Sequence, residues 1–345
     1  MNTTSEIIQP IKIFDSFWID CLSNNLINLL ITEDESNKAL PFLMKNEYFM
    51  TPIKGTYPDM KFDEWHITSG SSCVQVSFTP PYGELIDKFE HVDYKPHHDE
   101  DLIGKVEECI KEGYYVFVTV DRFYFPSTLD YKRKHLIHPT LIYGFNSLKN
   151  EFYLIDDVIK NGKQDKYVLS YSSFLESTGS VKKTGEIEIG AVRVKKPMMV
   201  HDFEERIILD NLRSILEFKI VPDPKYDKDW IYGIDLLLEY SKIMEDVLPL
   251  AEDSMRSIFL ANQAYQVQFK NLELVNILFE KKRLPDNQLR LHFEKICSKW
   301  KAYKYYMILY YEKQKAFDIK KMSGILESLH AMEVEATELF IRQLS

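Results

Sequence analysis

The chain has 345 residues, enough for two domains, and its 45% apolar and 28% charged residues are typical of a globular protein rather than a disordered one. Lys and Arg total 43 against 53 for Asp and Glu, so the formal net charge of -10 argues against binding to the phosphate backbone of a nucleic acid. No apolar run approaches the ~20 residues that span a bilayer, and no secretory signal opens the sequence. We therefore expect a cytoplasmic protein with neither a membrane nor a nucleic-acid partner.

Strand-like and helical segments alternate in the first half. An apolar stripe of helical spacing, formed by Leu22, Leu26, Leu29 and Leu30, predicts a helix that begins near Cys21. Strand-like runs cover residues 114–125, 138–146, 151–158 and 186–194, and the short turn 146–150 predicts a hairpin between the second and the third. We expect residues 1–200 to form an α+β domain with an antiparallel sheet.

The second half has a different texture, with few turn-forming residues and long apolar patterns of helical period. Five helices are predicted, at about 202–219, 228–248, 251–282, 286–316 and 318–344, with breaks at Pro-Asp clusters. We expect residues 201–345 to form a separate, all-helical bundle domain.

Metal and redox sites have little support. The cysteines, at positions 21, 73, 109 and 297, form no C-x-x-C pair, which disfavours a zinc ribbon or a redox dithiol. The run from His91 to Glu100 is rich in potential ligands, but its spacing fits no metal motif and Pro96 marks a loop. Nucleotide-binding glycine loops are also lacking, so we expect no metal and no other cofactor.

Cys21 is the candidate nucleophile. It stands at the predicted start of a helix, where unpaired N–H groups and the positive end of the helix dipole lower the pKa of a thiol. The same N–H groups, or the side chain of Asn24, are candidates for stabilising an oxyanion.

His138 is the candidate base, because it opens a strand and should therefore lie at the edge of the sheet. The next strand returns beside it and ends in Asp156 and Asp157, either of which could orient the imidazole. Only one of them faces His138 if the strand is regular, and we favour Asp156. His135 is an alternative base, although the cations before it suggest an exposed loop.

Asp121 lies in an apolar strand-like run, where burial would demand a partner. It is either a structural hydrogen-bond acceptor or part of a site for a substrate amine. Tyr124, in the same stretch, is a second candidate for substrate binding.

The order of these motifs carries a family resemblance. The segment HPTLIYGF at 138–145 resembles the histidine strand of papain-like cysteine peptidases. The chain is more similar to the family of the butirosin-biosynthesis acyltransferase than to these peptidases. Its members resemble this chain in a Cys-x-x-Asn helix start, here CLSN at 21–24, and in the run VDRFYFP at 120–126. The histidine strand and a strand that ends in aspartate follow, so the resemblance covers roughly residues 15–160.

The resemblance implies a papain-like fold and a triad of Cys21, His138 and Asp156. It also implies transfer of an acyl group from a phosphopantetheine thioester on a carrier protein to an amine, in natural-product biosynthesis. The acidic composition would suit a diamine acceptor. Papain-like peptidases carry a glutamine six residues before the cysteine, whereas this chain has Asp15. A hydrolase of the same fold and a non-catalytic binding protein remain the alternatives.

Overall fold

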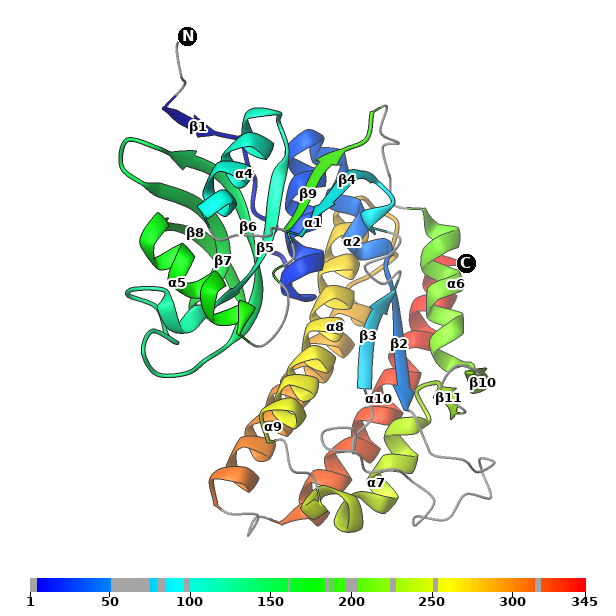
Figure 1. Cartoon of the computed structure of the whole chain (residues 1–345). Coiled ribbons are helices and arrows are strands. Elements are labelled where there is room, and N and C mark those ends of the chain that lie inside the picture. The colour runs from blue at the N-terminus through cyan, green and yellow to red at the C-terminus, as the bar shows by residue number, and fades with distance from the viewer. Residues whose placement is uncertain are drawn as a thin grey trace. The chain divides into compact units, whose positions relative to one another are not determined.

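The chain forms two compact units in the computed structural model (Figure 1). The structure describes residues 5–50, 75–79, 85–95, 100–160, 162–183, 187, 189–196, 204–223, 228–250, 254–313 and 318–345. The first unit combines Met1–Ala39 with Pro80–Asp202, and the second combines Leu40–Thr79 with Phe203–Ser345. The break after Asp202 is close to the predicted division. Leu40–Thr79, which was predicted to lie in the first domain, instead joins the second unit.

The first unit is built on an antiparallel sheet, so the predicted α+β class is confirmed. Its strands follow the order β4-β9-β5-β6-β7-β8, and β1 also pairs with β6. The four strand-like runs correspond to β5, β6, β7 and β9, with β6 and β7 joined as the predicted hairpin. The strands are β1 (Glu6–Ile8), β4 (Phe89–Tyr94), β5 (Tyr115–Asp121), β6 (Ile137–Asn146), β7 (Glu151–Lys160), β8 (Lys163–Ser170) and β9 (Ile189–Val194).

Helices cover both faces of this sheet. Apolar residues of α4 (Glu100–Lys111) and α5 (Tyr171–Lys182) share one buried cluster with alternate residues of β5, such as Val116, Val118 and Val120. The apolar residues of α1 (Cys21–Glu33) lie outside that cluster, and α1 contacts β6, β7 and β9. It therefore packs on the opposite face, where its first residue reaches the end of the sheet at which β6 begins.

Gly144 marks a close backbone approach inside the histidine strand. A Cβ atom at this position would lie 2.5 Å from the carbonyl oxygen of Ile7 and 3.0 Å from Cα of Ile8, because β1 crosses β6 there. The β6–β7 register also shifts between Ile142 and Gly144. The glycine that belongs to the family-like motif is thus required by the packing of β1.

The second unit contains the predicted five helices, but it is not all-helical. A sheet of order β10-β11-β2-β3 accompanies them, and the segment 219–232, partly predicted to be helix, forms the hairpin β10–β11. The part of the chain that the structure describes holds no helix long and apolar enough to cross a membrane. The elements are α2 (Leu40–Leu43), β2 (Lys45–Met50), β3 (Gln75–Thr79), α6 (Glu205–Leu216), β10 (Lys219–Asp223), β11 (Lys228–Tyr232), α7 (Leu236–Val247), α8 (Ser254–Glu280), α9 (Gln288–Glu312) and α10 (Ile319–Leu344).

A buried polar network explains why β2 belongs to this unit. The Glu333 carboxylate on α10 accepts hydrogen bonds from the hydroxyl of Tyr48 on β2 at 2.5 Å and from Nε1 of Trp300 on α9 at 2.5 Å. It also accepts one from Nε2 of Gln268 on α8 at 2.8 Å. Hydrogen bonds then continue from Gln268 through Asn271 and Asn46 to the ammonium of Lys270. The buried side chains of Asn46 and Tyr48 on β2 therefore find their partners on helices of the second unit.

This network makes the stability of the protein depend on pH. Burial raises the pKa of Glu333 from 4.5 to about 7, although the hydrogen bonds from Tyr48 and Trp300 oppose the shift. Between these values the unfolded chain loses the proton that the folded chain keeps, so stability falls as pH rises. We expect wild-type protein to lose about 2 kcal/mol more unfolding free energy than Glu333→Gln between about pH 5 and pH 7. Urea denaturation of the full chain measures this.

The matched control is Glu335→Gln, which changes an exposed carboxylate on the same helix. This variant should keep the wild-type dependence on pH. Equal slopes for wild type and Glu333→Gln would show that Glu333 is ionised in the folded protein throughout this range.

Candidate active site

Asp20 and Asn24 position Cys21 as the first residue of α1. Asp20 is the N-cap, and its Oδ1 accepts a hydrogen bond from the backbone N–H of Ser23 at 2.7 Å. The side chain of Asn24 turns back to the preceding loop, where Oδ1 accepts from Ile19 N at 2.9 Å and Nδ2 donates to the carbonyl of Phe17 at 3.3 Å. Asn24 is buried and holds the approach to the helix. The prediction of an oxyanion role for its side chain is therefore replaced by a positioning role.

Two further asparagines of α1 attach the helix to the sheet. Nδ2 of Asn28 donates to Oε1 of Gln164 on β8 at 2.7 Å, and Nε2 of Gln164 donates to Oδ1 of Asn25 at 2.6 Å. All three side chains are buried. Buried amides that satisfy one another in this way have a single favourable arrangement. They therefore fix the position of α1, and with it the position of Cys21, over the sheet.

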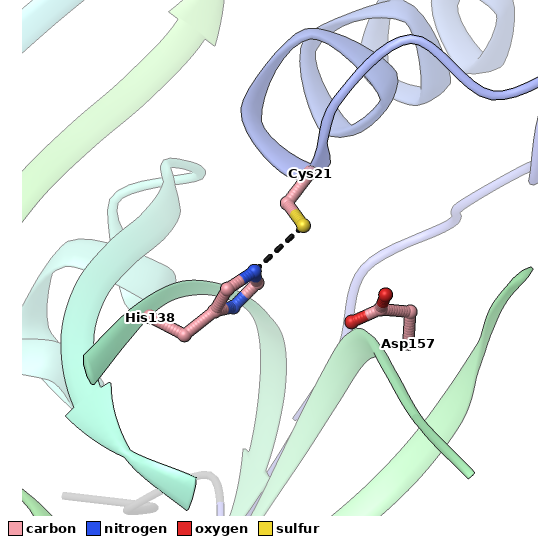
Figure 2. A group of neighbouring side chains, drawn as sticks. All are labelled: Cys21, His138 and Asp157. Carbon is pink, nitrogen blue, oxygen red and sulfur yellow. Dashed lines mark hydrogen bonds between the residues drawn. The ribbon is translucent and has the colours of Figure 1, made fainter. Parts of the chain in front are cut away.

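His138 lies at the start of β6, opposite Val120 of β5, and reaches Cys21 (Figure 2). Its Nε2 lies 2.6 Å from Sγ of Cys21. Both side chains are only partly buried, so the pair remains accessible from solvent. The structure thus brings together the two residues that the sequence proposed as nucleophile and base, across 117 positions of chain.

The carboxylates of Asp156 and Asp157 both converge on this pair. Oδ1 of Asp156 lies 3.7 Å from Nδ1 of His138, and Asp157 lies beside Cys21 and His138 (Figure 2). A regular strand would send these side chains to opposite faces, but the β7–β8 register shifts after Asp156. Asp157 Oδ2 also accepts a hydrogen bond from Gly162 N at 3.0 Å. The expected choice between the two aspartates therefore does not arise, because both belong to the site.

Arg122 is the site residue that sequence reasoning missed. It opens the 3₁₀ turn Arg122–Tyr124 after β5, and only 2% of it is exposed. Its Nη2 contacts the carboxylates of both Asp156 and Asp157 and lies 2.9 Å from Nδ1 of His138. One signal could have found it: an arginine directly after a buried strand must be paired if it is buried, and Asp156-Asp157 offers the charge.

Electrostatics at Cys21 differ from the expectation. Burial, with the negative charges of Asp157 and Asp156, raises the pKa of the Cys21 thiol, while Arg122 opposes this effect. The thiol pKa is thus raised, not lowered as its place at a helix N-terminus suggested. The pKa of Asp156 is lowered: burial acts to raise it, but the hydrogen bond with His138 and the charge of Arg122 outweigh burial. The resting site consequently holds a neutral thiol beside an ionised Asp156 carboxylate.

Asp121 has a structural role. Its Oδ1 accepts hydrogen bonds from the backbone N–H groups of Phe123 and Leu136, both at 3.1 Å, and its Oδ2 accepts one from the Ser180 hydroxyl at 2.8 Å. His135 Nδ1 lies 2.6 Å from the same Oδ2. With its oxygens occupied in this way, Asp121 is a buried anchor rather than a site for a substrate amine.

His135 and Tyr124 lie on the loop that Asp121 anchors. The His135 ring is exposed, stacks on Phe123 at 4.1 Å between centroids, and pairs with Asp121, which leaves His138 as the candidate base. Tyr124 packs edge-on against Phe123 at 5.1 Å. No contact in the described part of the chain brings Tyr124 to the Cys21–His138 pair.

Among the described residues, Cys21, His138 and Asp157 form the one group with metal-ligand character. Their potential ligand atoms all lie within 4.8 Å of one another. The Arg122 guanidinium, however, contacts Asp157 and faces the His138 ring, so a cation already occupies the anionic side of this group. Of the run 91–100, His91 and Asp93 are exposed on β4 rather than in the expected loop, and residues 96–99 lie outside the described residues. The geometry favours nucleophile chemistry over metal binding.

Comparison with known proteins adds no identification. No protein-family model matches the chain, and no curated protein matches its sequence.

The Arg122 pairing should dominate the stability of the first unit. Arg122→Met leaves two adjacent buried carboxylates without their cation, so we expect a loss of about 3–5 kcal/mol of unfolding free energy in urea denaturation. Arg193→Met is the control, because the Arg193–Glu90 pair is exposed and screened by solvent. Similar losses for both variants would contradict a special role for the buried cluster.

The reactivity of Cys21 should report its electrostatic environment. We expect its alkylation by iodoacetamide, followed by peptide mapping, to keep accelerating with pH above the ordinary thiol pKa of about 8.5. Asp157→Asn removes a negative charge beside the sulfur and should shift the profile to lower pH. A wild-type profile that levels off below pH ~8 would contradict the raised thiol pKa.

Proposed function

We propose that this protein is an acyltransferase that forms an amide bond through an acyl group carried on Cys21. One observation carries the proposal: a cysteine at a helix start lies 2.6 Å from a histidine, and an aspartate stands behind that histidine. A nucleophile, a base and a group that orients the base are the requirements for covalent acyl transfer. The proposed fold is papain-like, with α1 and the sheet supplying the two sides of the site.

In the first step, the sulfur of Cys21 attacks the carbonyl carbon of an acyl thioester. Because the thiol is neutral at rest, His138 Nε2 takes its proton as the new C–S bond forms. The C–S bond of the donor then breaks, and the departing thiolate takes the proton from His138. The result is an acyl-Cys21 thioester and a free donor thiol.

In the second step, an amine attacks the acyl-enzyme carbonyl and loses a proton to His138. The C–S bond to Cys21 breaks, and the sulfur recovers the proton from His138. Donor thioester and amine are thereby converted into amide and thiol, with no oxidant, metal or nucleotide required. The backbone N–H groups of Cys21 and Leu22 at the start of α1 are the proposed donors to the oxyanion, because that of Ser23 already donates to Asp20.

This mechanism sets a condition on Arg122. For His138 to accept a proton at Nε2, Nδ1 must carry a hydrogen and donate it to Asp156. A guanidinium can only donate, yet Nη2 of Arg122 lies 2.9 Å from Nδ1. The mechanism therefore requires the guanidinium to move away from Nδ1, so that Nδ1 can close the 3.7 Å gap to Asp156.

The resemblance of residues 15–160 to the butirosin-biosynthesis acyltransferase family favours an amine over water as acceptor. By the same resemblance, the donor is a phosphopantetheine thioester on a carrier protein. A papain-like hydrolase would use the same acyl-enzyme and release a free acid. The two are separated by what the acyl-enzyme delivers its acyl group to.

Intact-mass spectrometry tests the proposal directly. Incubation with short acyl thioesters of N-acetylcysteamine should add one acyl mass to the wild-type protein and none to Cys21→Ala. His138→Gln should acylate roughly 10²–10⁴-fold more slowly, because the general base is lost. Cys109→Ala and Cys297→Ala, which change two buried free cysteines, are the controls.

The acyl-enzyme is then challenged with a primary amine or a diamine. Amide as the main product supports the acyltransferase, and free acid supports the hydrolase. Acylation that persists in Cys21→Ala would overturn both.

A further inference from the structure

An exposed basic loop adjoins the proposed active site. It consists of residues 132–135, Lys-Arg-Lys-His, and lies in the connection between Arg122 and His138, both of which belong to the site. All four side chains are exposed. In a chain of formal charge -10, three consecutive cations at this position are a local reversal of sign.

The loop is held in place from several sides. The backbone N–H of Lys132 donates to the carbonyl of Phe123 at 3.0 Å, and the N–H of Leu129 donates to the carbonyl of Val158 at 3.2 Å. Its return is tied by the N–H of Arg122, which donates to Leu136 O at 3.0 Å. These hydrogen bonds therefore fix the backbone that carries the three cations.

These cations form no ion pair with the residues that the structure describes. Within the described parts of the chain, Lys132, Arg133 and Lys134 form no ion pair, although exposed cations elsewhere do, for example Lys12 with Glu35 and Arg193 with Glu90. Lys132 Nζ lies 5.2 Å from the centre of the Tyr131 ring, a contact that leaves its charge available to an anion. Exposed cations without an ion pair on an anchored loop can bind an anion, and a guanidinium is suited to the oxygens of a phosphate.

The loop is also within reach of the reacting atoms. Lys134 is four residues from His138, so their Cα atoms are separated by at most ~14 Å. An anion bound at the loop would therefore lie close enough to Cys21 for one flexible molecule to reach both. In a phosphopantetheine thioester, the phosphate and the sulfur stand at opposite ends of such a flexible arm.

We propose that the basic loop binds the phosphate end of the acyl donor while the thioester end reaches Cys21. The inference rests on the proposed function, and it names the feature of the donor that this chain recognises. The binding is electrostatic and exposed, so salt weakens it. Coenzyme A and a carrier-bound phosphopantetheine share the phosphate, and the loop recognises that group in either.

Binding can be measured without any chemistry at the thiol. In titration calorimetry with Cys21→Ala, 4'-phosphopantetheine should bind about ten-fold more tightly than pantetheine, which lacks the phosphate. Salt on the order of 0.5 M should remove the difference. A loop variant that combines Lys132→Gln, Arg133→Gln and Lys134→Gln should also lose the preference for the phosphorylated compound.

A control variant has the same change in charge in the second unit: Lys281→Gln, Lys282→Gln, Arg283→Gln. It should keep the preference for the phosphorylated compound. Equal affinity for the two compounds, a preference that survives in the loop variant, or equal loss in the control would each overturn the proposal.

Acylation of the wild-type protein gives the second readout. Acyl-phosphopantetheine should acylate Cys21 faster than acyl-pantetheine, and the ratio of the two rates should fall towards one in the loop variant. If acyl-coenzyme A is faster still, free coenzyme is the source; if it only equals acyl-phosphopantetheine, a single phosphate suffices, as on a carrier. A phosphate preference in binding with no acylation by any thioester would support the loop and overturn the acyl-transfer function.

Discussion

The first unit depends on a buried guanidinium held between two carboxylates. Arg122 follows β5, Asp156 and Asp157 end the regular part of β7, and His138 opens β6 between these two strands. Buried charges of this kind are tolerated only when they are paired, and each member is costly to remove. The cluster therefore joins three strands at one end of the sheet, which is the end where α1 places Cys21.

The same charges set the chemistry of the thiol. A helix N-terminus and Arg122 favour a thiolate, whereas burial and the carboxylates favour a thiol, and the second group prevails. In a site of this kind the cysteine is a protonated thiol, not a reactive thiolate, before substrate binds. Its reactivity has to come from transfer of the proton to His138 during attack, which ties activation to the presence of a substrate.

The second unit deals with buried charge in a different way. Glu333 and Lys270 are both fully buried, and burial brings the pKa of each to about 7, from opposite directions. Amide side chains connect them, and because amides can both donate and accept, they carry hydrogen bonds from one charged group to the other. The apolar patterns of the second half predicted the helices of this core. They gave no sign that β2, from the first half of the sequence, completes it.

Sequence alone determined what depends on local rules: the helix that starts at Cys21, the β6–β7 hairpin, the helices of the second half and the selection of Cys21 and His138 as candidates. It could not determine which strands of distant segments pair, because registry between β2 and β11 has no local signal. Nor could it show that Arg122 lies between two aspartates, or that Asn24 and Asp121 have structural roles. Those outcomes depend on which buried polar groups meet once the chain has folded, and burial then decides the sign of the pKa shift at Cys21.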